Sequence, residues 1–286
     1  MLNTDGAMTR LQCDFKAHLL RKGMEERTVK LYEAELKQFM TWCSAAKLSL
    51  FDMVPEHIYK YREAKLEHGM KLATVNKEIS MISTFFKWAK EAGLACSNPA
   101  ENIRIPEMKK PPRGLTDEEV EKLIAYALME RNDFKRTRNV ALLFVMLYAG
   151  LRLEEVSDLK LDSLKERALL VYDRELPVRT VPLDERTFSR LNDWLEHRKT
   201  MKRPEHTASQ SFFVSERSGF MQPRAIQFVI ETFSEKIGVH FVCQTLRHTY
   251  CYRLAKQGAT VHQLKQWAGH KSILTSYQYF EQGGLR

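Results

Sequence analysis

The sequence has few cysteines and no long hydrophobic run, and each shortage excludes a class of protein. Its 286 residues include five cysteines and no C-x-x-C pair: Cys13, Cys43, Cys96, Cys243 and Cys251. An odd number at irregular spacing argues against a disulfide framework and a thiolate zinc site, and suits a reducing cytoplasm. The longest apolar run, at 141–150, is too short to span a bilayer, and the N-terminus lacks the layout of a secretory signal. We therefore expect a cytoplasmic protein with no membrane partner.

Charge is the first feature that points towards a function. The chain carries 45 lysines and arginines against 36 acidic residues, which gives a formal net charge of +9. A basic excess favours a polyanionic partner, of which nucleic acid is the commonest. Solvated lysine and arginine faces explain the same charge without any such partner, so charge alone does not decide between the two.

The first hundred residues predict helices almost throughout. Two stretches, 28–43 and 73–93, have the apolar spacing of amphipathic helices. We expect Thr28 and Thr74 as their N-caps and Gly93 as the stop of the second. The predicted buried stripes are Leu31, Leu36, Phe39 and Met40 in the first, and Val75, Ile79, Ile82, Phe86 and Ala89 in the second. Core packing explains these stripes, and they indicate a small helical domain.

A basic, proline-rich segment follows this helical domain. Four prolines within the stretch from Pro99 to Pro112 exclude a regular helix, and lysines and an arginine at 109–113 add positive charge. A helix then resumes at Thr116, with Glu119 forming a capping box. We therefore predict domains at 1–106 and 116–286, joined by a linker at 107–115.

The second predicted domain mixes helices with a β-hairpin. Residues 168–173 and 178–183 have the composition of strands and are joined by the short segment RELP, which predicts the hairpin. The predicted helices lie at 117–130, 134–149, near 154, and then at about 185–200, 223–237, 246–257 and 260–268. The fold class is therefore mainly α with a small β component.

Three places in this second domain carry chemically unusual residues. Arg152 follows Gly150 at a junction between helices, where Glu155 could hold it and aim it at an anion. Arg247, with the histidine after it, is expected to open a helix whose N-terminal amides favour a phosphate. His270 is followed nine residues later by Tyr279, with a second tyrosine at 277. Each place taken alone is more simply explained as a surface arginine, a basic first turn, or structural aromatics.

Taken together and in this order, the residues resemble the signature of the tyrosine recombinase (phage integrase) family. The pattern is an arginine in G-L-R, then L-R-H-T, then G-H, then a tyrosine nine residues on, and it falls here on Arg152, Arg247, His270 and Tyr279. The stretches 85–106 and 113–124 resemble the end of the family's core-binding domain and the entry to its catalytic domain. The chain is most similar to Xer-like and transposon-encoded members. The resemblance implies a helical SAM-like core-binding domain followed by a mixed α/β catalytic domain.

The resemblance also implies a reaction. The two arginines would clamp the non-bridging oxygens of a scissile phosphate, because guanidinium binds phosphate bidentately and stays charged. Tyr279 would attack the phosphorus to give a 3′-phosphotyrosyl link and a free 5′-hydroxyl, and His270 would donate to a phosphate oxygen. No nucleotide, metal or other cofactor is needed, and the sequence has no G-x-x-x-x-G-K-[ST] loop. The implied partners are a double-stranded DNA recombination site and further copies of the chain, as a dimer on one site and a tetramer in the synapse.

Two positions depart from the family pattern. Gln244 stands where a histidine is expected, and an amide can donate a hydrogen bond but cannot carry a proton at neutral pH. Arg174 stands where the hairpin usually carries a general-acid lysine, and guanidinium is a reluctant proton donor. Arg174 could still neutralise the leaving oxygen, or Lys165 or a lysine from elsewhere could supply the proton. Both possibilities stay open.

The function expected from the resemblance is site-specific DNA recombination in integration, excision or resolution. Two alternatives remain at this point. Gln244 and Arg174 together suggest a DNA-binding protein with the recombinase fold and impaired catalysis. A type IB topoisomerase-like enzyme, which nicks and reseals without exchange, would use the same catalytic residues.

Overall fold

The chain folds into two compact units, which are considered separately. The computed structural model describes residues 4–103, 112–173 and 176–281. Contacts divide the chain into an N-terminal unit, 1–109, and a C-terminal unit, 110–286. The division falls within the predicted linker, most of which lies outside the described residues.

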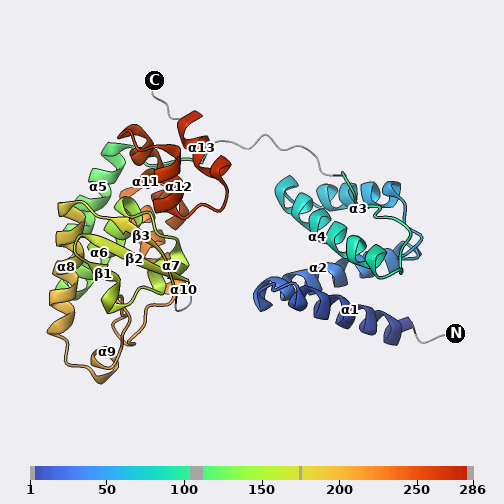
Figure 1. Cartoon of the computed structure of the whole chain (residues 1–286), viewed down its shortest axis with the longest axis horizontal. Coiled ribbons are helices and arrows are strands. Elements are labelled where there is room, and N and C mark those ends of the chain that lie inside the picture. Colours follow the sequence, from blue (N-terminus) through green and yellow to red (C-terminus); the bar gives the residue numbers. More distant parts are fainter. Residues whose placement is uncertain (1–3, 104–111, 174–175, 282–286) are drawn as a thin grey trace. The chain divides into compact units, whose positions relative to one another are not determined.

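The N-terminal unit is helical in all its regular structure within the described range (Figure 1). Its helices are α1 (Thr4–Arg21), α2 (Glu26–Ala45), α3 (Pro55–Glu67) and α4 (Leu72–Glu91). Aromatic rings from different helices meet edge to face in its core, with ring centroids 5.1 Å apart for Phe39 and Tyr61 and 5.3 Å apart for Phe15 and Phe85. Such pairs add to the free energy of burying the rings, so the unit has a core of its own.

The predicted stripes of this unit and the stop at Gly93 are mostly confirmed, whereas the two predicted threonine N-caps are wrong. Every residue of the second stripe is buried, but in the first stripe Leu31 is 44% exposed. Helix α2 begins at Glu26 and α4 at Leu72, so both proposed threonine caps lie inside the first turn. Glu26 and the residues preceding Thr74 are good helix formers, which extends each helix upstream of the threonine.

Three side chains in the N-terminal unit form one polar network around a buried carboxylate. The hydroxyl of Tyr61 donates to the carboxylate of Glu78 at 3.1 Å, and the ammonium of Lys65 lies 3.1 Å from the same carboxylate oxygen. Glu78 is 4% exposed. One buried negative charge is thus compensated by one positive charge and a hydroxyl.

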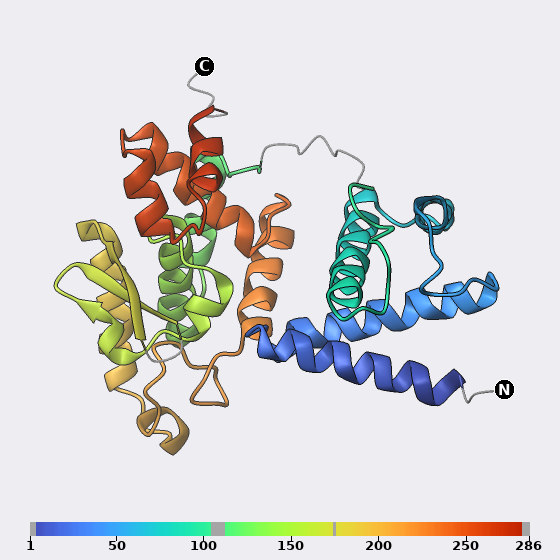
Figure 2. The same ribbon diagram turned by 45° about the vertical axis from the view of Figure 1, so that its right-hand side comes forward.

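The C-terminal unit contains all the helices that the sequence predicts for it, together with elements that the sequence did not reveal. Its elements are α5 (Asp117–Leu128), α6 (Asp133–Tyr148), α7 (Leu153–Ser157), the short 3-10 helix η1 (Leu161–Ser163), β1 (Leu164–Lys165), β2 (Ala168–Asp173), β3 (Leu176–Pro182), α8 (Glu185–Lys199), α9 (Pro204–Thr207), α10 (Pro223–Ile237), α11 (Cys243–Lys256), α12 (Val261–Ala268) and α13 (Ile273–Glu281). The additional elements are η1, β1, α9 and α13. Helices α11, α12 and α13 gather at one end of the unit, and α9 lies at the other (Figures 1 and 2).

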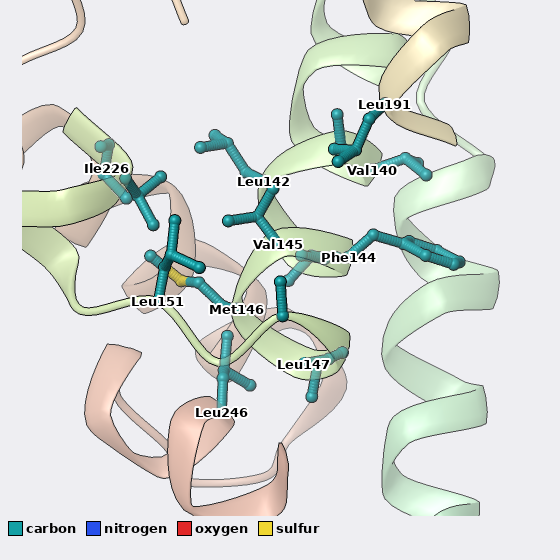
Figure 3. Close-up of a cluster of buried hydrophobic side chains, with 14 of the residues drawn as sticks. Val140, Leu142, Phe144, Val145, Met146, Leu147, Leu151, Leu191, Ile226 and Leu246 are labelled. Carbon is teal, nitrogen blue, oxygen red and sulfur yellow. The ribbon is translucent and has the colours of Figure 1, made fainter. Parts of the chain in front are cut away.

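Helix α6 is the centre of this unit and sets the position of the residues after it. Its side chains from Val140 to Leu147 are buried, and the helix packs against α5, α8 and α11. Figure 3 shows Leu191, Ile226 and Leu246, from three other helices, around it. The helix ends just before Gly150, which has φ +61° and whose Cβ would lie 2.0 Å from the ring of Tyr250. Only glycine fits this turn, which leads directly to Arg152.

The sheet confirms the predicted hairpin and adds one short strand. The strand order is β1-β2-β3, all antiparallel, and the buried residues Leu169 and Val181 face one another across β2 and β3. Strand β3 begins at Leu176, so part of the predicted RELP connection belongs to the strand. Arg174, the predicted substitute for the general-acid lysine, lies outside the described residues.

None of the helices in the described ranges combines the length and apolar character that a bilayer span requires.

Candidate active site

Arg152 is held at the N-terminus of α7 by the carboxylate that the sequence suggested. Its backbone N–H donates to Glu155 Oε2 at 2.6 Å, and its Nη1 donates to Glu155 Oε1 at 2.8 Å. Its Nη2 donates to the carbonyl of Gly269 at 2.5 Å, 117 residues further along the chain. Arg152 therefore joins α7 to the turn that carries His270.

Arg179, which sequence reasoning missed, occupies the other side of the same carboxylate. Its Nη1 and Nη2 donate to the two oxygens of Glu155 at 2.7 and 2.8 Å, and its Nε donates to the carbonyl of Trp267 at 2.8 Å. Burial is the largest influence on Glu155 and raises its pKa, but Arg179 and Arg152 outweigh burial and bring that pKa to about 2. One carboxylate thus serves two arginines, and the cluster keeps a net positive charge.

Gly269 allows Arg179 to approach the chain this closely. It ends α12 with φ +66°, and a Cβ there would lie 2.8 Å from Arg179 Nη1. The glycine of the G-H pair is therefore required both by the left-handed turn and by the guanidinium packed against it.

Arg247 lies in the second turn of α11, since that helix begins at Cys243. The expectation that Arg247 opens the helix is therefore wrong, because an extra turn from Cys243 to Leu246 precedes it. The Arg247 guanidinium is buried, and it donates to the carbonyl of Gly150 and, at 2.5 Å, to the carbonyl of Ala268. Burial lowers its pKa. Within the described ranges it forms no ion pair with a carboxylate, so its buried charge is left without a direct counter-ion.

His270 is fixed beside these arginines as a neutral ring. It is 8% exposed, and its Nδ1 lies 2.8 Å from the hydroxyl of Ser276 on α13. Burial, and then the positive charges of Arg247 and Arg152, lower its pKa to about 4. At neutral pH the ring is therefore uncharged, with one nitrogen able to donate a hydrogen bond.

Tyr279 lies in the interior of this cluster, on α13. It is 2% exposed, and its ring stacks on that of His270, with centroids 5.9 Å apart and 9° between the planes. Its hydroxyl is 2.6 Å from Nδ1 of His248 on α11. Burial raises the pKa of Tyr279. Tyr277, on the same helix, is 49% exposed. The sequence did not reveal α13, although the apolar spacing of Ile273–Phe280 is a signal for it.

Of the two positions that depart from the family pattern, only Gln244 lies within the described residues. Gln244 is exposed in the first turn of α11 and shares with Arg152 the wall of a cavity of about 300 Å³. Lys165 is exposed on β1. The structure therefore brings four of the six predicted site residues into one chain of contacts: Arg152, Arg247, His270 and Tyr279.

A hollow beside the cluster has more basic than acidic side chains in its wall. It has a volume of about 700 Å³, and Arg152, Arg179 and His270 line it together with Lys265 and Lys271. Acidic side chains, including Glu155, also line it, but Glu155 is engaged by two arginines. Guanidinium groups fixed in this way match the geometry of a phosphate.

Two family models match the chain, one within each unit. The family model described as the phage integrase family matches residues 113–283, and the model described as the phage integrase N-terminal SAM-like domain matches residues 13–93. Tyrosine recombinase XerC of Leptospira interrogans is 24% identical over 266 residues, which cover 91% of this chain and 84% of that protein.

Solved structures share the fold. The Tn1549 transposon integrase in complex with circular intermediate DNA has a TM-score of 0.79 and 16% identity, and the match covers 96% of this chain and 94% of that one. A lambda integrase dimer bound to a COC' core site has a TM-score of 0.74 and 18% identity, with 97% and 96% covered.

Proposed function

The chain belongs to the phage integrase family, and we propose that Tyr279 is the nucleophile with which this tyrosine site-specific recombinase breaks and rejoins DNA. The observation that carries the assignment is the position of Tyr279. Its ring lies on His270, inside a cluster whose arginines have more positive charge than the neighbouring carboxylate can balance.

A bound phosphate diester supplies the missing negative charge. A buried cation without a counter-ion is destabilised by its loss of hydration, and an anion that replaces that hydration is bound strongly. Arg152 and Arg247 would each donate to a non-bridging oxygen, and His270 would donate to the same phosphate through its protonated nitrogen. These donors are held in place before the reaction, so they stabilise the charge that develops in the transition state.

Tyr279 would then attack the phosphorus. The bond from its oxygen forms as the bond to the 5′ oxygen breaks, which leaves a 3′-phosphotyrosyl link. Attack by a 5′-hydroxyl on that link restores the DNA backbone and frees the tyrosine. Because Tyr279 is 2% exposed in the free chain, this step requires the surface over α13 to open when DNA binds.

The leaving 5′ oxygen needs a proton or a positive charge. We assign this role to Arg174, because it aligns with the usual lysine of the hairpin, and its contribution would be mainly electrostatic. Lys165 on β1 is the second candidate.

The partners follow from the same proposal. Double-stranded DNA carrying the recombination site is the substrate, with a dimer of the chain on one site and a tetramer in the synapse. Residues 1–106 would bind DNA, 107–115 would be the linker, and 116–286 would carry out catalysis. The solved lambda integrase dimer on its core site supports this arrangement, and five free cysteines support a reducing, cytoplasmic setting.

The test uses a duplex that the protein itself selects from a random library. A nick placed beside the cleavage site lets the released fragment diffuse away, so the covalent complex accumulates and migrates slowly on a denaturing gel. We expect the adduct with the wild-type chain and with Tyr277→Phe, the matched control on the same helix, and none with Tyr279→Phe. An adduct formed by Tyr279→Phe and lost in Tyr277→Phe would show that the assignment is wrong.

A further inference from the structure

We propose that His248 accepts the proton of Tyr279 when the tyrosine attacks the phosphate. This inference rests on the proposed function and adds to it, because Gln244 cannot serve as the base and the cleavage step needs one.

The geometry places a ring nitrogen directly at the reacting oxygen. His248 lies on α11, one residue after Arg247, and its Nδ1 is 2.6 Å from the hydroxyl of Tyr279 on α13. That separation is within the range expected of a proton donor and its base. The two rings have centroids 5.8 Å apart and planes at 36°. The ring is therefore directed at the hydroxyl and does not lie flat against it.

The direction of this hydrogen bond follows from the acidity of the two groups. A phenol is a stronger acid than the N–H of a neutral imidazole, so the bond is more stable when Tyr279 donates and Nδ1 accepts. Burial, and then Arg247, lower the pKa of His248 to about 4, so the ring is neutral at neutral pH. Cys251 also bonds the hydroxyl of Tyr279, and burial raises its pKa to about 11, so its thiol stays protonated and does not compete as a base.

Other groups near Tyr279 do not meet the requirement. His270 lies parallel to the tyrosine ring, and its Nδ1 is engaged with Ser276. Gln244 is exposed one turn earlier on α11, and its amide cannot take up a proton. Among the described residues, His248 is therefore the basic nitrogen in contact with the hydroxyl.

Phosphate binding makes His248 a better base. In the free chain the charge of Arg247 disfavours a proton on the neighbouring ring. A phosphate bound by Arg247 brings a negative charge beside it and raises the proton affinity of Nδ1. As the bond from Tyr279 to phosphorus forms and the bond to the 5′ oxygen breaks, the proton moves from Tyr279 to Nδ1. The 5′ oxygen takes its proton from a separate acid, and Nδ1 returns its proton to Tyr279 on resealing.

The main experiment replaces the base without removing the hydrogen-bond acceptor. In His248→Asn the amide oxygen lies near the position of Nδ1, so it can hold Tyr279 but cannot carry its proton. Single-turnover cleavage of the selected nicked duplex is measured for wild type and variant, each with tyrosine or difluorotyrosine at position 279. Fluorination lowers the phenol pKa, so the nucleophile depends less on a base.

We expect His248→Asn to cleave about 100- to 10,000-fold more slowly at neutral pH, as for loss of a general base. We expect difluorotyrosine, or a higher pH, to recover much of that loss. If His248→Asn cleaves at the wild-type rate, the proposal is overturned, because proton transfer to His248 is then not needed. If it cleaves faster, the proposal is also overturned, because the hydrogen bond from Tyr279 to His248 then holds the tyrosine back. A loss that difluorotyrosine does not recover also overturns it, because His248 would then only position the helix. If wild type forms no adduct at all, the proposed function fails instead.

A second measurement needs no DNA and is made on the wild-type chain. Nitrogen NMR of the wild-type chain with isotope-labelled histidine identifies which ring nitrogen of His248 carries hydrogen, with His248→Asn used to assign the signal. The proposal requires Nδ1 without a hydrogen at neutral pH. A hydrogen on Nδ1 would contradict it, because that nitrogen could not then accept a proton.

Discussion

The two units bury polar groups in opposite ways. In the N-terminal unit, the carboxylate of Glu78 is matched by the ammonium of Lys65 and the hydroxyl of Tyr61. In the C-terminal unit, Glu155 is shared by two arginines, and Arg247 donates only to carbonyls within the described ranges. In the first network the buried carboxylate has a positive partner, whereas in the second the buried Arg247 has no carboxylate partner within the described ranges. Buried polar groups of the first kind maintain a fold, whereas those of the second kind prepare a site for an anion.

Among the changes that test this comparison, the loss of an arginine from the C-terminal cluster should have the largest effect. Arg247→Ala and Arg152→Ala should each slow cleavage by about 100- to 1,000-fold, because each removes a donor to charge that develops in the transition state. Single-turnover cleavage of the selected duplex measures this, with gel-shift binding as the control. Cleavage near the wild-type rate in either variant would remove that arginine from the clamp.

A substitution of Glu155 tests whether cleavage requires Arg152 and Arg179 to be held in position. Glu155→Gln weakens the bonds to Arg152 and Arg179, and we expect cleavage to fall by about 100-fold, because small displacements of catalytic groups are costly. Glu121→Gln, the same change at an exposed position on α5, is the control and should cleave normally. Equal rates for the two variants would mean that Glu155 does not position the clamp.

A change in the polar network around Glu78 should affect stability and leave the cleavage chemistry unchanged. Tyr61→Phe leaves Glu78 without one donor, and we expect this to lower the free energy of unfolding of that unit by about 1–3 kcal/mol. Hydrogen exchange of α3 and α4 peptides reports the change, and Tyr59→Phe at an exposed position is the control. Once DNA is saturated, the cleavage rate should equal that of wild type. A slower chemical step in Tyr61→Phe would break the contrast between the two units.

The last prediction concerns pH. His248 and His270 have pKa values of about 4 in the folded chain against 6.5 in the unfolded chain. Between pH 6.5 and 4 the unfolded chain binds more protons than the folded chain, so the free energy of unfolding falls as the pH falls through this range. Above pH 6.5 these two histidines change it little. The N-terminal unit contains His18, whose pKa is lowered in the same direction, first by burial and then by Lys22. Hydrogen exchange across this range should show the larger loss in the C-terminal unit, and an equal loss in both units would contradict the assignment.

Much of the fold could be read from the sequence because apolar periodicity and capping motifs are local signals. The capping box at Thr116 and the hairpin strands are of this kind, and both are present. The threonine caps of α2 and α4 were misplaced because helix formers upstream extended each helix. Helix α13 was missed because it is short and its stability comes from packing against α11 and α12.

In the site, contacts between residues close in sequence could be predicted, whereas contacts between distant residues could not. Arg152 and Glu155 are three residues apart, so their pairing could be expected from the sequence. Arg179 reaches that pair from a strand 24 residues away, and His248 meets Tyr279 across 31 residues. No local pattern marks either contact, because each depends on how α11, α13 and the sheet pack together.

The central claim is that Tyr279 attacks a phosphate held by the unbalanced cations of the C-terminal unit. The most direct measurement is mass spectrometry of the trapped covalent complex after nuclease and protease digestion. The account predicts a nucleotide joined through its 3′ phosphate to the peptide that contains Tyr279, with fragmentation placing the added mass on that residue. A nucleotide on Tyr277, on any other residue, or joined through a 5′ phosphate would contradict it.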